Sequence, residues 1–253
     1  MAEEERAETP AEVEETGDLF FLYRPKVEHD AASGMDDVER LHMVLRPSER
    51  RLWRLLVLGA KRLPSLRDHE RNWGFVDRVL RRAEDVRDAF AAQVYETKTR
   101  GLRHLAPARP AGEGVYALVR RGAQVYLACR LELPERPGPV QQALGITPEA
   151  VYALSIKNPR APGAALLGEG RAHLPERLQA GFHGRRFEGE SAAPLDHEGI
   201  EFLLAGVGTG AEALAPGALE AEHEDARSSD LLDLLGTRRE RKVTGPLIEG
   251  VWA

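Results

Sequence analysis

The sequence predicts a fold of the α+β class that is mainly antiparallel β, with few short helices. Short runs in which apolar and polar residues alternate recur along the chain, and most of them stop at a proline or glycine. Segment 112–206 repeats the order of features in 17–94, which suggests an internal duplication of two β-rich halves forming a sandwich or barrel-like core. Unrelated antiparallel meanders would also resemble each other in this way, so both explanations stay open.

The N-terminal half is expected to contain a tail, four strands and one helix. Residues 1–16 hold seven glutamates and few apolar residues, so we expect a disordered acidic tail. The first β-rich half, 17–94, begins at Leu19 and ends in a helical pattern over 78–92. Its strands are expected over 19–23, 41–46, 52–58 and 73–76.

The C-terminal half, 112–206, is expected to open with a β-hairpin around Arg121-Gly122. Its strands are expected over 115–119, 124–133, 151–156 and 199–206, with helical segments over 139–144 and 175–179. The remaining residues, 207–253, form a helical and loop extension in which Ser229 precedes a short helix, 230–235. This extension ends in an apolar segment carrying Trp252, which we expect to dock on the domain or on a protein partner.

Charge is strongly segregated along the chain. Residues 46–121 carry a net charge of +9 in a protein whose total is −6, and the segments before and after them are acidic. Within that basic region, residues 95–111 join the two halves and combine cations with glycines and hydroxyls, which are the groups that anion sites use. The alternative is a solvated basic linker that pairs with nearby carboxylates.

Seven residues form the predicted anion-binding site. Most lie in the junction, and two cations that end the first strand are expected to converge on it. The set is Arg24, Lys26, Lys98, Arg100, Arg103, His104 and Arg109. Aromatic residues between cations, such as Trp53 and Trp73, can stack bases, but more often belong to the core with arginines turned outward, and we favour the core.

Catalytic signatures are weak. No Gly-x-Ser-x-Gly, Walker or Rossmann pattern is present, and the histidines show no metal-binding spacing, so the sequence indicates no cofactor and no metal site. Cys129 lies in an alternating strand and is expected to be a buried thiol. The enzyme alternative uses His104 as acid/base and Arg100 and Arg103 as clamps for an anionic small molecule.

The N-terminus lacks the apolar region of a secretory signal, and no apolar run is long enough to cross a membrane. With a single cysteine, these features predict a soluble, cytoplasmic protein without a membrane partner.

Several motifs together resemble an uncharacterised family of bacteria, plants and fungi. They cover nearly the whole chain from residue 17: GDLFFLYRPKV (17–27), DVERL (37–41), WGFV (73–76), YETKTRG (95–101), GEGVY (112–116), IKNP (156–159) and GPL through Trp252 (245–252). The resemblance implies an intact family domain of shared shape, and no activity. Transcription-factor names given to some fungal relatives are not carried over, because the sequence shows no zinc finger, homeodomain or helix-turn-helix pattern.

The sequence therefore favours a non-enzymatic binding module with a basic surface for an anionic partner: nucleic acid, an acidic protein segment or a phosphorylated ligand. A structural subunit whose Trp252 segment docks into a partner is a further interpretation. The acidic tail, 1–16, is a candidate mimic of the anion, and its deletion is then expected to strengthen anion binding.

Overall fold

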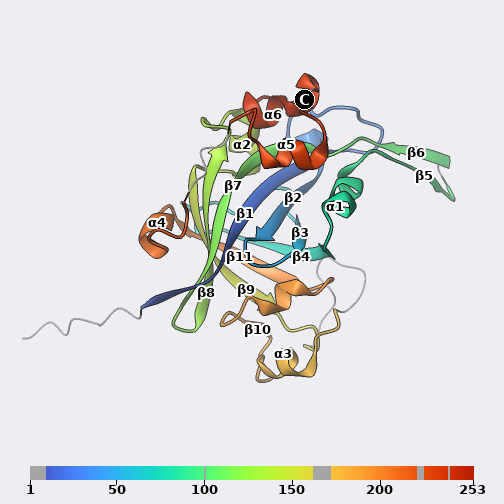
Figure 1. Cartoon of the computed structure of the whole chain (residues 1–253). Coiled ribbons are helices and arrows are strands. Elements are labelled where there is room, and N and C mark those ends of the chain that lie inside the picture. The colour runs from blue at the N-terminus through green and yellow to red at the C-terminus, as the bar shows by residue number, and fades with distance from the viewer. Residues whose placement is uncertain (1–9, 100, 162–171, 221–224, 239) are drawn as a thin grey trace, which may run out of the picture.

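A computed structural model describes residues 10–99, 101–161, 172–220, 225–238 and 240–253 (Figure 1). It confirms the mainly antiparallel β fold with few short helices, organised around a closed eight-stranded barrel. The order around the barrel is β1-β2-β3-β4-β11-β9-β8-β7, and β7 pairs with β1 to close it. The strands are β1 (Ala11–Pro25), β2 (Val38–Pro47), β3 (Trp53–Leu58), β4 (Arg71–Leu80), β7 (Arg109–Arg121), β8 (Gln124–Leu133), β9 (Glu149–Lys157) and β11 (Glu201–Gly208), and the short β10 (Phe187–Glu188) extends the sheet beside β9.

Each half of the chain contributes four consecutive barrel strands. Strands β1 to β4 come from the first half, and β7, β8, β9 and β11 come from the second. The first strands of the two halves, β1 and β7, pair with each other, and so do the last strands, β4 and β11. Two similar halves related by a twofold rotation would give this arrangement, and the internal duplication stays a prediction.

Part of the predicted disordered tail, 1–16, differs from the sequence prediction, and residues 1–9 of it lie outside the described residues. Residues 11–16 are not disordered but form the beginning of β1, where they pair with β7. The glutamates there meet arginines: Arg120 donates to Glu14 over 2.8 Å and also pairs with Glu12. Composition overstated the repulsion in this segment because the cations that offset it lie about a hundred residues further along the chain.

Alternation along the strands separates the barrel interior from its outer face. In β1, Leu19, Phe21 and Tyr23 belong to the large interior cluster, which also contains Cys129 as a buried free thiol, as expected. Phe20 and Leu22 point the other way, into an outer cluster with residues of the surrounding helices. The barrel is therefore a packed core with a second apolar layer on one outer side.

Short helices cover that outer side. The predicted helix over 78–92 is shorter, α1 (Ala83–Phe90), because β4 continues to Leu80 through its pairing with β3. The predicted N-cap is confirmed, since the Ser229 hydroxyl accepts from the Leu232 amide over 3.1 Å. The other helices are α2 (Pro139–Leu144), α3 (Glu176–Ala180), α4 (Ala211–Leu214), α5 (Asp230–Leu235) and α6 (Arg241–Ile248), with two 3-10 turns, η1 (Met35–Asp37) and η2 (Ala193–Asp196). Within the described residues, no helix has the length and apolar character needed to span a bilayer.

The Trp252 segment docks on the domain. The Trp252 ring packs edge-to-face on Tyr23, with 5.3 Å between ring centroids. The Ala253 carbonyl accepts hydrogen bonds from the Tyr23 hydroxyl (3.0 Å) and the Ala32 amide (3.1 Å). This contact within the chain accounts for the Trp252 ring, and a role for Trp252 in binding a partner stays a prediction.

Candidate functional site: the β5–β6 arm and the charged end of the barrel

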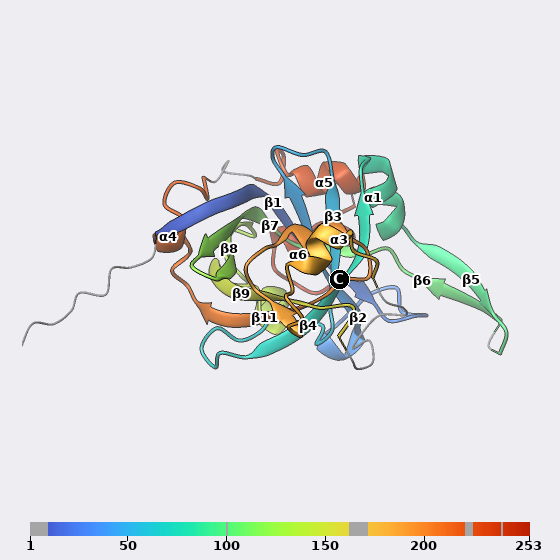
Figure 2. The same cartoon turned by 90° about the horizontal axis from the view of Figure 1, so that it is seen from below.

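Residues 93–105 form a two-stranded arm, where the sequence predicts a loop over 95–111. Strand β5 (Gln93–Thr97) pairs with β6 (Gly101–Leu105), and Tyr95 lies opposite Arg103. Gly101 has a φ of 64°, a left-handed conformation that glycine adopts readily and that helps the chain reverse. Figures 1 and 2 show this arm standing away from the barrel in both views.

The arm exposes apolar side chains to solvent. Val94 is 65% exposed, Leu102 is 73% exposed and Tyr95 is 40% exposed. Three of the six exposed large hydrophobic residues in the described part of the chain therefore lie on these two strands. Val94 and Leu102 share one face, because Val94 is opposite His104 and two residues from Glu96, which is opposite Leu102.

Arg24 fastens both roots of the arm to the barrel. This side chain lies at the end of β1, is 5% exposed, and donates to the carbonyl oxygens of Ala89 (2.8 Å), Ala91 (3.2 Å) and Ala106 (2.7 Å). Burial, followed by the charge of Arg40, lowers the pKa of Arg24 to about 10, so the guanidinium stays charged at neutral pH. Arg24 does converge on the junction as expected, but its N–H groups donate to main-chain carbonyl oxygens and not to a ligand site.

A buried histidine lies beside this clamp. His42 packs edge-to-face against Phe90 at 5.2 Å between ring centroids, and neither of its ring nitrogens has a hydrogen-bond partner among the described residues. Burial and the positive charges of Arg24 and Arg40 lower the pKa of His42 to about 3. His42 is therefore neutral, and its ring packs as an uncharged group against Phe90 of α1.

Arg109 and Lys26 lie at the base of the arm. Arg109 is buried and donates to the Asp30 carbonyl over 2.7 Å, and burial lowers the pKa of its guanidinium. The main-chain amide of Lys26 donates to the Asp37 carbonyl, and its side chain is partly buried. Arg109, like Arg24, thus holds a loop in place instead of facing solvent.

Only part of the predicted anion site lies on the arm. Lys98 is exposed, whereas Arg103 lies 3.5 Å from the Glu28 carboxylate and His104 lies 3.8 Å from Asp30. The His104 main chain is also held by Glu28, whose amide donates to the His104 carbonyl and whose carboxylate accepts from the His104 amide. Arg100 lies outside the described residues.

The six described residues of the predicted site thus do not form one continuous basic surface. Arg24 and Arg109 are buried and structural, Lys26 is partly buried near them, and Lys98, Arg103 and His104 belong to the arm. Sequence reasoning missed Glu28 and Asp30, whose carboxylates approach Arg103 and His104 from a separate loop. No local pattern connects these acids to the junction, because they lie about seventy residues before it.

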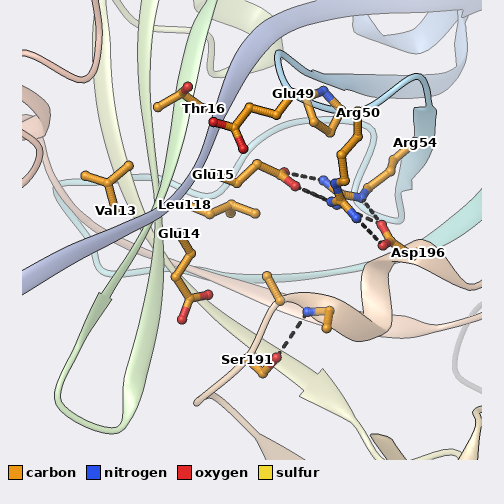
Figure 3. Close-up of a pocket in the computed structure, with 13 residues that line it drawn as sticks. Val13, Glu14, Glu15, Thr16, Glu49, Arg50, Arg54, Leu118, Ser191 and Asp196 are labelled. Atoms are coloured by element: carbon orange, nitrogen blue, oxygen red, sulfur yellow. Dashed lines mark hydrogen bonds and ion pairs between the residues drawn. The ribbon is translucent and has the colours of Figure 1, made fainter.

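The opposite end of β1 contributes to a buried network of charges (Figure 3). Arg54, which is 1% exposed, donates through Nε to Asp196 Oδ1 (2.8 Å) and through Nη2 to Glu15 Oε2 (2.9 Å). Tyr116 donates to Glu15 Oε1 (2.7 Å), and Arg50 donates to Asp196 Oδ2 (2.6 Å) and pairs with Glu15. A cavity of about 390 Å³ lies beside this network.

The network satisfies its own charges. Burial acts to raise the pKa of Glu15, but the hydrogen bonds and charge of Arg54, with those from Tyr116 and Arg50, outweigh it and hold this pKa below its ordinary value. Burial acts to lower the pKa of Arg54, and its bonds and proximity to Glu15 raise it on balance. A carboxylate that stays ionised with both oxygens occupied is poorly suited to donate a proton. The contacts of this barrel-end network instead hold β1, β3 and the Asp196 turn together.

The interior position of Arg54 follows from strand alternation that the sequence does reveal. Trp53 and Leu55 belong to the outer cluster, so Arg54 between them points into the barrel. The sequence-based expectation of core is confirmed for Trp53, which is buried, whereas Trp73 is only partly buried. Across the described ranges, no group of three or more His, Cys, Asp or Glu residues is arranged to hold a metal ion.

Comparison of the chain with protein-family models, with curated protein sequences and with solved structures gave no match. A function for this chain is therefore inferred from its own geometry, and the resemblance based on the motifs stays a prediction.

Proposed function

We propose that this protein is a non-enzymatic interaction module that presents the β5–β6 arm to an anionic macromolecular partner. The observation that carries the proposal is the arm itself. It stands away from the barrel, exposes Val94 and Leu102 on one face, and is fastened at both roots by Arg24 (Figure 1). Solvent-exposed apolar residues on a projecting hairpin whose two ends are held to the domain are typical of interaction surfaces.

The open strand edge favours an extended protein segment as the partner. In the described part of the chain, β5 pairs only with β6, so alternate residues of β5 direct main-chain donors and acceptors outward. Two-stranded hairpins are marginally stable in water, and a third strand from a partner would complete this one. Exposed Val94 and Leu102 would then be covered by side chains of the added strand.

Charge favours an acidic segment. Residues 93–105 contain three Lys and Arg residues and one glutamate, a net charge of +2 with histidine neutral. Lys98 is exposed and has no ion-pair partner among the residues described. Glu28 offsets part of the charge of Arg103, so Lys98 is the cation of the described arm that remains without an ion pair.

The enzyme alternative has less support. His104, the candidate acid/base, is part of β6 with a side chain that is 45% exposed, and it lines neither the cavity beside Glu15 nor the hollow beside the loop that joins β2 to β3.

Buried Cys129, a free thiol whose pKa is raised by burial, supports a reducing and so cytoplasmic location as part of the proposal.

Fluorescence anisotropy of a labelled peptide in which valine and glutamate alternate tests the proposal on the full chain. We expect it to bind more tightly than a matched valine-lysine peptide, and the double variant Lys98→Glu/Arg103→Glu to weaken its binding about tenfold through reversed local charge. The matched control is Arg71→Glu/Arg136→Glu, which reverses two exposed arginines away from the arm. Equal losses in the two variants would attribute binding to net charge and contradict the proposal.

A second pair of measurements separates partner classes. Val94→Ser/Leu102→Ser is expected to weaken peptide binding while leaving the charge unchanged. If instead a short DNA duplex binds the arm with a steep salt dependence and the peptide does not, nucleic acid replaces the protein segment as the partner and the strand-pairing proposal is wrong.

A further inference from the structure

A second hollow, separate from the arm, lies on the outer side of the loop that joins β2 to β3. Its volume is about 550 Å³, within the range of small-molecule sites. We propose that this arginine hollow binds a small molecule carrying a phosphate group. The charged residues that line it are Arg46, Arg50, Arg51, Arg81, Asp18 and Glu49, which give the lining a net charge of +2.

Arg46 is held in place before any ligand arrives. Its guanidinium carbon lies 5.2 Å from the ring centroid of Trp53 and 5.8 Å from that of Phe20. Its nitrogens pair with the carboxylates of Asp18 on β1 and Asp230 at the start of α5. A guanidinium stacked and paired in this way keeps a fixed position, so Arg46 shapes one wall of the hollow while Asp18 and Asp230 offset its charge.

Arg50 connects the hollow to the buried network. It donates to Asp196 over 2.6 Å and pairs with Glu15, yet its side chain remains 42% exposed. Arg50 lines both the cavity beside Glu15 and the arginine hollow. The barrel-end network that holds Arg50 therefore also positions one wall of the hollow. The rigid barrel thereby fixes two of the four guanidinium groups.

Arg51 and Arg81 supply the uncommitted charge. Both are exposed, and neither has an ion-pair partner among the described residues. Guanidinium groups bind phosphate oxygens through paired, charge-assisted hydrogen bonds, so Arg51 and Arg81 are the groups that suit a phosphate, beside a wall shaped by the paired Arg46 and Arg50. Glu49 also has no ion-pair partner in the described ranges, and its carboxylate opposes an anion at the same place.

The location makes this inference independent of the arm. Asp18, at the hollow, and Arg24, at the root of the arm, lie six residues apart on β1, or about 20 Å along an extended strand. The shared chemistry of the ligand is a phosphate group, which a free phosphate or a phosphate ester could supply. Binding of probes of each kind distinguishes the two sources.

Titration calorimetry of the full chain with inorganic phosphate, pyrophosphate and phenyl phosphate tests the site. We expect Arg51→Ala and Arg81→Ala each to weaken binding several-fold, and Glu49→Gln to tighten it, because that change removes an opposing charge. Arg136→Ala removes an exposed arginine elsewhere and is the matched control, with no change expected. Tighter binding of phenyl phosphate than of inorganic phosphate would identify an ester as the ligand class.

The folded state of each variant is checked by its thermal unfolding temperature. Arg51 and Arg81 make no ion pair with the described residues, so both alanine variants should unfold close to the wild-type temperature. Unchanged binding in both variants, an equal loss in Arg136→Ala, or an absence of binding heat with all three probes would overturn the proposal. Replacing both residues with lysine provides a further check, since a lysine retains the charge and should recover part of the affinity.

Discussion

The arm and the charged end of the barrel are both rich in cations, but they use them differently. At the barrel end, Arg54 has almost no exposed surface and its guanidinium is bound by two carboxylates. On the arm, Lys98 is exposed without an ion pair in the described ranges, and the two strands that flank its turn expose apolar side chains. The formal charge of a segment therefore does not measure the charge available to a partner, since a buried cation uses its hydrogen-bond donors on groups within the fold.

The largest expected effect comes from breaking the barrel-end network. Arg54→Ala leaves Glu15 and Asp196 without their principal partner, and we expect a loss of about 3–5 kcal/mol in the free energy of unfolding. Urea denaturation measures it, with Arg136→Ala as a surface control expected to stay within about 0.5 kcal/mol. A loss below about 1 kcal/mol would show that the network is dispensable and weaken the contrast with the arm.

The arm's root should show the next largest effect. Arg24→Met removes three hydrogen bonds to main-chain carbonyls, so we expect a loss of about 2 kcal/mol and faster amide exchange over 93–105. Hydrogen exchange read by mass spectrometry measures the second effect. Arg40→Met, at the neighbouring exposed arginine, is the control. Unchanged exchange in the arm would mean that Arg24 does not fasten it.

The pH dependence of stability isolates Glu15. Because the folded state holds the pKa of Glu15 below its ordinary value of 4.5, its ionised form adds stability that is present above that value and is lost as pH falls through the folded pKa. We expect Glu15→Gln to be less stable than wild type by about 2 kcal/mol at pH 7, with the gap narrowing below pH 4.5. A gap independent of pH, measured by denaturation at several pH values, would contradict an ionised Glu15.

The smallest expected effect on stability is on the arm's surface. Val94→Ser/Leu102→Ser alters two exposed side chains, so the free energy of unfolding should change by less than about 0.5 kcal/mol. The paired control, Leu19→Ser at a buried interior position, should be strongly destabilising. A large loss in the arm variant would show that the arm packs on the domain and is not a free interaction surface.

Much of the fold can be predicted from the sequence because local patterns determine it. Alternation and proline or glycine stops located most of the barrel strands, and the hydroxyl of Ser229 marked the start of α5. The α1 boundary was wrong at Leu80 because pairing with Trp53 extends β4, and no local pattern reports a partner strand. The same reason explains why residues 11–16 form a strand despite their composition.

The candidate sites were harder to predict because their charges come from distant segments. Arg50 and Arg54 meet Glu15 and Asp196, which lie about 35 and 140 residues away along the chain. Arg46 and Arg51 lie close together in sequence, but Arg81 lies thirty residues further on, and the pairing of β3 with β4 brings it to the same hollow. The tertiary structure, and not the spacing along the sequence, determines which cations remain accessible to a ligand.

A two-dimensional amide NMR titration of the isotope-labelled full chain shows whether the arm binds a macromolecular anion while the barrel end does not. On addition of the valine-glutamate peptide, we predict that the amide signals of β5 and β6 shift, whereas those of residues 46–54 and of Arg81 remain in place. Shifts confined to residues 46–54, with the arm unchanged, would contradict the account.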